Sequence, residues 1–519
     1  MCMAKTRGAI AAGHPQTVEA GLEMFRLGGN AFDAAIASVL ASFITEPALT
    51  SPAGGGFLLA HTAQNQQILF DFFAQTPRQK QPLDQIDFYP IQVDFGTAVQ
   101  EFHVGLGSMA VPGAIAGVFH VHQRLGRLPL HVVAEPAIHY AKYGIGLSEL
   151  QAYCFDILSP ILLADDAMKA VVAPHGTLLK AGDQLRMTDL ADTLTYLINH
   201  GAREFYEGDI AHQLVRDCQI RGGYLTLDDL RHYQVIERTP LTTQYRGKTL
   251  LTNPPPSSGG ALIAFSLALL SMIDVGRLDF GSAEHISILA HAMSLTNQAR
   301  TDGYDQHLYD PDILHTFLSA DHLSSYRHLF SSVTNKWGST THISVLDEDG
   351  NAASVTASNG EGASYVIPGT GIMMNNMLGE ADLHPTGFHH WRENVRISSM
   401  MAPTIVLGHD YPEIVTGSGG SNRIRTAILQ IISNLIDFKM PVNDAVNRGR
   451  IHWENGVLNL EPGFDVDVDA AMLPADSVIL PWSQHNLFFG GVHTVTQLAP
   501  SQFEGAGDRR RSGAFAQCD

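Results

Sequence analysis

The spacing of hydrophobic and polar positions changes near residue 340 of this chain. Before it, apolar residues recur at helical intervals, as Val18, Leu22 and Phe25 do ahead of a glycine pair. The pattern predicts helices over residues 15–26, 31–44, 118–126, 132–143, 187–199, 210–217 and, after a rigid loop at 254–260, 261–273. After residue 340, short apolar segments predict strands over 342–347, 352–357, 372–376, 403–407 and 413–416, then a helix over 424–436. Helices interleaved with strands favour a layered protein.

The first of these strands opens a hairpin with two threonines at its head. Ile343 and Val345 point to one face, and Asp349-Gly350 supplies the tight turn. A cut before Thr340 would place a hydroxyl nucleophile and a free α-amine on one residue. An α-amine with a pKa of about 7.7–8 can take the hydroxyl proton near neutral pH. Threonine pairs also precede ordinary strands because of their β propensity, so the hairpin alone leaves both interpretations open.

Composition excludes several classes of partner. The formal net charge of −20 over 519 residues argues against nucleic acid and anionic membrane surfaces. The longest apolar runs, at 34–44 and 261–273, are too short to span a bilayer, and the first residues lack the apolar run of a secretory signal. Four scattered cysteines fit a reducing compartment, and we expect a cytoplasmic protein. The 25 histidines show no metal-ligand spacing, so neither a metal nor a cofactor is expected.

Further motifs extend along nearly the whole chain. They are His14-Pro15, Leu27-Gly28-Gly29-Asn30-Ala31-Phe32-Asp33-Ala34-Ala35, Glu46-Pro47, Ala53-Gly54-Gly55-Gly56-Phe57, Val111-Pro112-Gly113, Pro254-Pro255-Pro256-Ser257-Ser258-Gly259-Gly260, Asn375-Asn376, Ser398-Ser399-Met400 and Thr416-Gly417-Ser418-Gly419-Gly420. Through these motifs in this order, the chain resembles the γ-glutamyltranspeptidases, self-processing N-terminal-nucleophile hydrolases also called glutathione hydrolases. The resemblance implies an α+β fold, a four-layer αββα sandwich. It also implies two intertwined cleavage products in one structural unit, a large subunit 1–339 and a small catalytic subunit 340–519.

The resemblance assigns catalytic roles to individual residues. Thr340 aligns with the family's nucleophile, and Ser358 takes the place of a second hydroxyl residue, more often threonine, near the nucleophile's amine. Acyl transfer builds negative charge on a carbonyl oxygen, which needs preorganised donors. The family's glycine-rich turn supplies them from the backbone, and here we expect Gly420 with Gly419 or Ser421.

Substrate contacts are implied in the same half of the chain. Ser398 and Ser399 match paired serines that hold a substrate α-carboxylate. Glu380 or Asp382 would bind an α-ammonium group, and Asn359 is the expected amide contact. The partners would be a small γ-glutamyl amide as donor and water, an amino acid or a peptide amine as acceptor.

One position departs from the family. Its Asp-x-Arg-Glu-x-x-Pro motif carries an arginine that grips the α-carboxylate, and this chain has Phe73 there. An Arg–carboxylate contact contributes about 1.5–3 kcal/mol, and phenylalanine cannot replace it. Either Arg78, Arg392 or Arg396 reaches the site instead, or the acyl group is not an ordinary γ-glutamyl.

Three functions stay open on these grounds. The leading hypothesis is a self-processed amidohydrolase that cleaves γ-glutamyl amides through an acyl-Thr340 intermediate. The second is an acylase that acts on another amide, such as a glutaryl-like one, in keeping with Phe73. The third is an uncut, non-catalytic binding protein.

Overall fold

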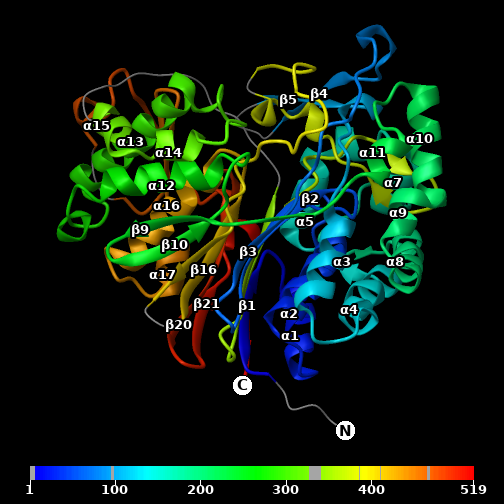
Figure 1. The fold of residues 1–519 in the computed structure, drawn as a ribbon, viewed down its shortest axis with the longest axis horizontal. Helices are drawn as coiled ribbons and strands as arrows, with labels where there is room; N and C mark the ends of the chain where they lie inside the picture. Colours follow the sequence, from blue (N-terminus) through cyan, green and yellow to red (C-terminus); the bar gives the residue numbers. More distant parts are fainter. Residues whose placement is uncertain (1–5, 95–98, 327–339, 385, 409–410, 465–467) are drawn as a thin grey trace.

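Two β-sheets lie in the middle of the molecule, with helices on both outer sides (Figure 1). The computed structural model describes residues 6–94, 99–326, 340–384, 386–408, 411–464 and 468–519. Helices and strands alternate along the described chain, as expected of an α+β protein.

The first sheet has seven strands in the order β22-β1-β11-β12-β2-β3-β8, each antiparallel to its neighbours. The strands are β1 (Gly8–Ala12), β2 (Gly55–His61), β3 (Gln67–Phe72), β8 (Ile236–Arg238), β11 (Thr341–Asp347), β12 (Ala352–Ser358) and β22 (Ala514–Cys518). The predicted hairpin is β11–β12, and it lies between β1 and β2. One sheet therefore combines strands from before residue 340 with strands from after it, and β1 lies between two of the latter.

The second sheet has six strands in the antiparallel order β21-β20-β16-β15-β10-β9. The strands are β9 (Leu241–Tyr245), β10 (Lys248–Thr252), β15 (Thr404–Leu407), β16 (Pro412–Gly419), β20 (Gly491–Ala499) and β21 (Gln502–Ala506). Strand β16 packs against β11 and β12 of the first sheet. The Ser354 hydroxyl crosses this interface and donates to the Thr416 carbonyl at 2.9 Å.

Helices form the two outer layers. On the first sheet lie α1 (Pro15–Arg26), α2 (Ala31–Thr45) and α3 (Ala114–Leu125), to the right in Figure 1, and α4 (Leu130–Tyr143) packs on α2. On the second lie α12 (Gly259–Leu270) and α16 (Arg423–Ile436), to the left, and α13 (Ala283–Ala299) packs on α12. Helix α2 is buried along its whole length, and a capping box between Asn30 and Asp33 fixes its start. The four-layer αββα prediction is confirmed.

The remaining elements surround this frame. The other α-helices are α5 (Glu149–Ile157), α6 (Ser159–Leu162), α7 (Asp166–Val172), α8 (Thr188–His200), α9 (Arg203–Glu207), α10 (Asp209–Arg221), α11 (Leu227–Arg231), α14 (Ile313–Phe317), α15 (Ala320–Ser325) and α17 (Val442–Asn447). The small sheets contain β4 (Tyr89–Asp94), β5 (Val99–Val104), β6 (Ile145–Gly146), β7 (Gln184–Leu185), β13 (Val366–Ile367), β14 (Ile372–Met373), β17 (Ile451–Glu454), β18 (Val457–Leu460) and β19 (Val478–Pro481). Among the described residues, none of the helices is long and apolar enough to cross a membrane.

Several predicted boundaries are wrong: the helix expected from 118 starts at Ala114, the helix expected to end at 217 ends at Arg221, and the strand expected to end at 416 ends at Gly419. Two further differences have a clear physical reason. The strand expected over 372–376 ends at Met373, because the Asn375 side chain turns to bond the backbone of Ala53 and Ala110. The loop expected over 254–260 ends early, because α12 already begins at Gly259. A Cβ at Gly259 would overlap the carbonyl of Met400, so glycine lets the start of the helix approach that segment instead of breaking the helix.

Candidate active site

Thr340 lies immediately before β11 and is buried, with 5% of its surface exposed. Its carbonyl oxygen accepts a hydrogen bond from Nη1 of Arg511 at 2.8 Å. A Cβ at Gly419 would overlap the same oxygen, so the end of β16 can pack on Thr340 only because residue 419 is glycine. Thr340 is thereby fixed between its own strand and the glycine turn after β16.

A small hollow of about 30 Å³ opens beside Thr340. Its lining residues are Phe73, Thr340, Ser358, Met377, Glu380, Asp382, Leu383, Ser399, Met400, Met401, Ser421 and Ile424. This acyl hollow brings together most of the predicted site: Thr340, Ser358, Glu380, Asp382, Ser399 and Ser421. The other predicted residues, Asn359, Ser398, Gly419 and Gly420, adjoin it in sequence without lining it.

Ser358 ends β12 and is nearly buried, and its hydroxyl oxygen accepts the backbone N–H of Gly360 at 3.0 Å. The Asn359 side chain turns away to the Met374 carbonyl, at 3.4 Å. Gly360 has a φ of +60°, and a Cβ there would overlap side-chain oxygens of Asn376 and Glu380. Glycine is therefore required at position 360, which by plain alignment would carry the family's asparagine.

The glycine turn connects β16 to α16. Gly420 has a φ of +126° and Ser421 a φ of +50°, so the backbone reverses sharply before the helix starts at Arg423. The Ser421 hydroxyl donates to the carboxylate of Asp382. Since Ser421 and Ile424 both line the hollow, the first turn of α16 borders it. A helix N-terminus carries partial positive charge, which suits a site where an oxyanion develops.

The two acidic side chains of the hollow differ in their surroundings. Burial raises the pKa of Asp382, while the Ser421 hydrogen bond and the charges of Arg423 and Arg300 counteract part of that rise. Burial also raises the pKa of Glu380 well above its ordinary value, and the negative charges of Glu361 and Asp382 raise it further. Oε1 of Glu380 is buried and has no hydrogen-bond partner among the residues described.

The paired serines, Ser398 and Ser399, have different surroundings. Ser399 lines the hollow, and its hydroxyl oxygen accepts the backbone N–H of Met401 at 3.0 Å. The hydroxyl of Ser398 lies 3.2 Å from that of Ser258, at the start of α12. Only Ser399 is therefore placed to touch a molecule in the hollow as the side chains stand.

None of the arginines proposed to replace the missing family arginine lines the hollow. Arg396 is buried, pairs with Asp71 at 3.1 Å and donates to backbone carbonyls, including that of Phe73 at 3.2 Å. Arg78 pairs with Asp228 at 2.9 Å. Arg392 stacks on Tyr309, with 5.2 Å between its guanidinium carbon and the ring centre. The Phe73 ring stacks on Phe57 at 5.4 Å and is 1% exposed, so it forms an apolar wall where the family has a cation.

Sequence reasoning missed two charged residues behind Thr340. Arg511 belongs to a short arginine run near the C-terminus that resembles a surface cluster, but it is buried against the Thr340 carbonyl. Glu46 was noted only within a motif, and it accepts a hydrogen bond from the Thr341 hydroxyl at 2.6 Å. Burial raises the pKa of Glu46 to about 7. Neither residue has a local spacing signal, because Arg511 reaches Thr340, and Glu46 its neighbour Thr341, from distant segments.

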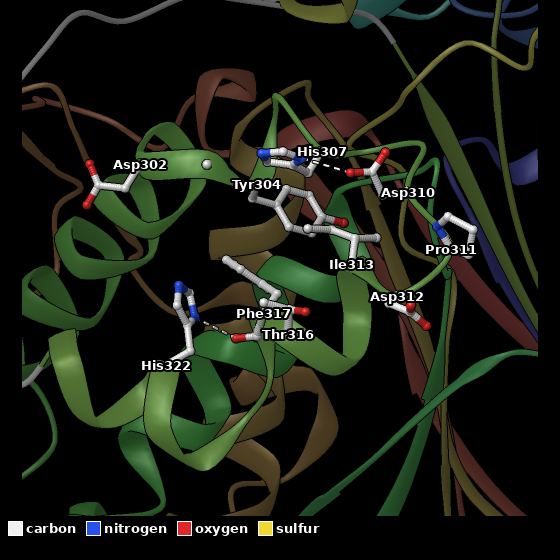
Figure 2. Close-up of a pocket in the computed structure, with 11 residues that line it drawn as sticks. Asp302, Tyr304, His307, Asp310, Pro311, Asp312, Ile313, Thr316, Phe317 and His322 are labelled. Atoms are coloured by element: carbon white, nitrogen blue, oxygen red, sulfur yellow. Dashed lines mark hydrogen bonds and ion pairs between the residues drawn. The ribbon is translucent and has the colours of Figure 1, made fainter.

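A larger hollow, of about 400 Å³, lies between residues 302 and 322. Figure 2 shows Tyr304, Ile313 and Phe317 grouped within it, beside the hydrogen bond between His307 and Asp310, whose nitrogen and oxygen are 2.7 Å apart. No predicted site residue lines it. This hollow is larger than the acyl hollow, but the nucleophile and the glycine turn select the smaller one.

A four-layer αββα sandwich with a threonine heading a central strand defines the class of N-terminal-nucleophile hydrolases. The chain belongs to the γ-glutamyltranspeptidase family, because the model described as gamma-glutamyltranspeptidase matches residues 17–518. It is an enzyme of this family of N-terminal threonine hydrolases and acyltransferases, and an amidohydrolase.

The relatives carry two kinds of name. The glutathione hydrolase proenzyme of Escherichia coli (strain K12) is 31% identical over 494 residues, which cover 89% of this chain and 84% of that protein. The acylase ACY 1 proenzyme of Pseudomonas sp. (strain V22) is 30% identical over 482 residues, 90% of this chain and 86% of that protein. A crystal structure of cephalosporin acylase from Bacillus halodurans shares the fold, with a TM-score of 0.84 at 24% identity over 99% of this chain and 96% of that chain. Family membership thus does not choose between γ-glutamyl and other acyl donors.

Proposed function

We propose that this chain cuts itself between Ser339 and Thr340 and then uses Thr340 to cleave a small amide. The observation that carries the proposal is the position of Thr340, buried in the acyl hollow and packed on the glycine turn. Self-cleavage begins when the Thr340 hydroxyl attacks the Ser339 carbonyl. The acyl group moves from nitrogen to oxygen, and water then hydrolyses the ester, which frees the amine. Ser339 lies outside the described residues.

In the processed enzyme, the free amine of Thr340 accepts the proton of its own hydroxyl as the oxygen attacks the substrate carbonyl. Backbone N–H groups of the turn at Gly419, Gly420 and Ser421 stabilise the oxyanion. Collapse expels the substrate amine, which takes the proton, and leaves an ester on Thr340. Water or an acceptor amine then releases the acyl group. Ser358 orients the Thr340 amine, and Ser399 contacts the acyl chain.

The proposed fragments 1–339 and 340–519 stay together as a heterodimer. Strands β11, β12 and β22 of the second fragment would share one sheet with β1, β2, β3 and β8 of the first. Separating the fragments would break the ladders on both sides of the β11–β12 hairpin and on one side of β22. The cytoplasmic location inferred from the sequence stays a prediction.

Two donor classes fit this chemistry. A γ-glutamyl amide is the donor expected from the family, with Glu380 or Asp382 on its α-ammonium group and Ser399 as a further contact. Asn359 and Ser398 could contribute only if their side chains left Met374 and Ser258. An acylase acting on a group without the full α-amino acid head is the second candidate. The apolar wall at Phe73 favours it, since the described arginines nearby are engaged elsewhere.

Intact mass spectrometry of the denatured protein tests the proposal. We expect two fragments that meet between Ser339 and Thr340, and a single uncut chain for Thr340→Ala. Incubation with an anilide donor should add one acyl mass to the small fragment. A wild-type chain that stays uncut would remove the catalytic base and favour the binding-protein hypothesis instead.

A further inference from the structure

The charged side chains that line the acyl hollow in the described structure are all acidic. Its lining contains two carboxyl side chains, Glu380 and Asp382, and, within the described part of the chain, neither Lys, Arg nor His. The rest of the lining is hydroxyl-bearing or apolar. A site built for an α-amino acid head needs one group for the ammonium and another for the carboxylate. The described lining offers charged side chains only for the ammonium, and for a carboxylate it offers hydroxyl groups such as that of Ser399.

The carboxylate of Asp382 already interacts with other groups of the protein. It accepts the Ser421 hydroxyl, and the positive charges of Arg423 and Arg300 act on it. Its carboxylate supports the glycine turn and has less capacity left for a ligand.

Glu380, unlike Asp382, is not held at its Oε1 atom by a hydrogen bond from the described part of the protein. Oε1 is buried without a hydrogen-bond partner in the described structure, and the charges that act on the carboxyl group, those of Glu361 and Asp382, are both negative. Gly360 holds the neighbouring loop against Oε1, since any Cβ there would overlap it. Glu380 therefore has negative charges near it and, among the groups that act on it in the described structure, no positive one. A cationic ligand would supply the missing positive charge.

The hollow disfavours a ligand that carries a carboxylate. Phe73 walls it where a guanidinium would have to stand, and Arg396 is held by Asp71 and by the Phe73 carbonyl behind that wall. A ligand carboxylate would be desolvated near Glu380 and Asp382 with no cation in the described lining to balance it. Removing charge from water without pairing it is strongly unfavourable.

We propose that the acyl hollow takes a short acyl group that carries an amine and no carboxylate, bound through Glu380, with Phe73 excluding carboxylate-bearing donors. This inference rests on the proposed function and specifies its donor. In chemical terms the donor is an ω-aminoacyl amide, one carboxylate short of γ-glutamyl.

Four 4-nitroanilides separate the two charges of a γ-glutamyl group. The γ-glutamyl donor has both amine and carboxylate, 4-aminobutyryl has the amine alone, glutaryl the carboxylate alone, and butyryl neither. With the self-processed enzyme, we expect kcat/KM for 4-aminobutyryl to exceed that for butyryl by about tenfold or more, the difference made by one charge-assisted contact. Glutaryl should fall below butyryl, and γ-glutamyl below 4-aminobutyryl.

A processed enzyme that prefers glutaryl or γ-glutamyl to 4-aminobutyryl overturns the inference and leaves the proposed function intact. A chain that never cuts itself overturns both. If the cut enzyme turns over none of the four, the shift in thermal midpoint with 4-aminobutyramide is compared with that from glutaramic acid. A larger shift with the amine supports the inference, and an equal or larger shift with the acid overturns it.

Two variants assign the effect to residues. Glu380→Gln should lower the ratio of 4-aminobutyryl to butyryl turnover by about tenfold, and the matched control Glu393→Gln, at an exposed position outside the lining, should not change it. Phe73→Arg should raise the ratio of γ-glutamyl to 4-aminobutyryl turnover. An unchanged ratio in Glu380→Gln, in a variant that still cuts itself, would contradict the assignment even if Phe73→Arg fails to fold.

Discussion

The two ends of the acyl hollow obey different constraints. At the Thr340 end, the chain keeps the family's nucleophile and glycine turn, and the packing is tight: a Cβ at Gly419 would overlap the Thr340 carbonyl that Arg511 also binds. At the acyl end, Phe73 stands where the family has an arginine, and it lines the hollow without disturbing the fold. The difference indicates that the reaction is fixed by close backbone packing, whereas the donor is set by a few side chains that can change independently.

The largest effect should come from the Thr340 end. Thr340→Ala should abolish self-cleavage and lower turnover of every anilide by more than about 1,000-fold, since nucleophile and base are lost together. Glu380→Gln should alter only the relative rates among donors. Intact mass measures self-cleavage, and initial rates measure turnover of the four anilides. If both variants lost turnover equally on all four donors, the two ends of the hollow would not differ in function.

The buried acid behind Thr340 should make stability depend on pH. Burial raises the pKa of Glu46 from 4.5 to about 7, so the folded chain keeps a proton that the unfolded chain has already lost. The free energy of unfolding therefore falls as pH rises through that window, by up to about 3 kcal/mol, and the loss is complete above it. Glu46→Gln should flatten this dependence.

This experiment is best made in the uncut Thr340→Ala chain, where unfolding involves one polypeptide. Urea unfolding is followed from about pH 4.5 to about pH 8, a range that spans both pKa values. The exposed-site variant Glu393→Gln serves as control and should keep the wild-type slope. A Glu46→Gln chain with that same slope would show that Glu46 ionises normally in the fold.

Gly419→Ala should separate packing from chemistry at the Thr340 end. The new Cβ forces the Thr340 carbonyl and the end of β16 apart. A displacement of about 1 Å near a reacting centre costs on the order of 100-fold, so self-cleavage should slow by about that factor. Gly146→Ala is the control, since the nearest atom to its new Cβ is 3.9 Å away. Normal cleavage kinetics in Gly419→Ala would refute tight packing at this point.

Much of the fold was predictable from local patterns, because helices such as α1 and α16 have regular apolar spacing and clear ends. The β11–β12 hairpin was predictable for the same reason. The site was predictable only in part. Motifs selected Thr340 and the glycine turn, but no local pattern indicates Arg511 or Glu46. Arg511 reaches Thr340, and Glu46 reaches Thr341, across long stretches of sequence. The separation of Ser398 from Ser399 also depends on a tertiary neighbour, Ser258.

The smallest effect should arise where the two ends meet, at the hydrogen bond from Ser421 to Asp382. Ser421→Ala removes it, lets the pKa of Asp382 rise further and should lower kcat/KM on all donors by about tenfold, the value of one hydrogen bond to a charged group. Ser421→Gly should lose as much activity while relieving the positive φ of this residue, so its thermal midpoint should be higher than that of the alanine variant. In an Asp382→Asn background, Ser421→Ala should cost less than in the wild type, because the charged partner is already gone. Equal losses in both backgrounds would mean that the turn is held without Asp382, and that the two ends of the hollow are energetically independent.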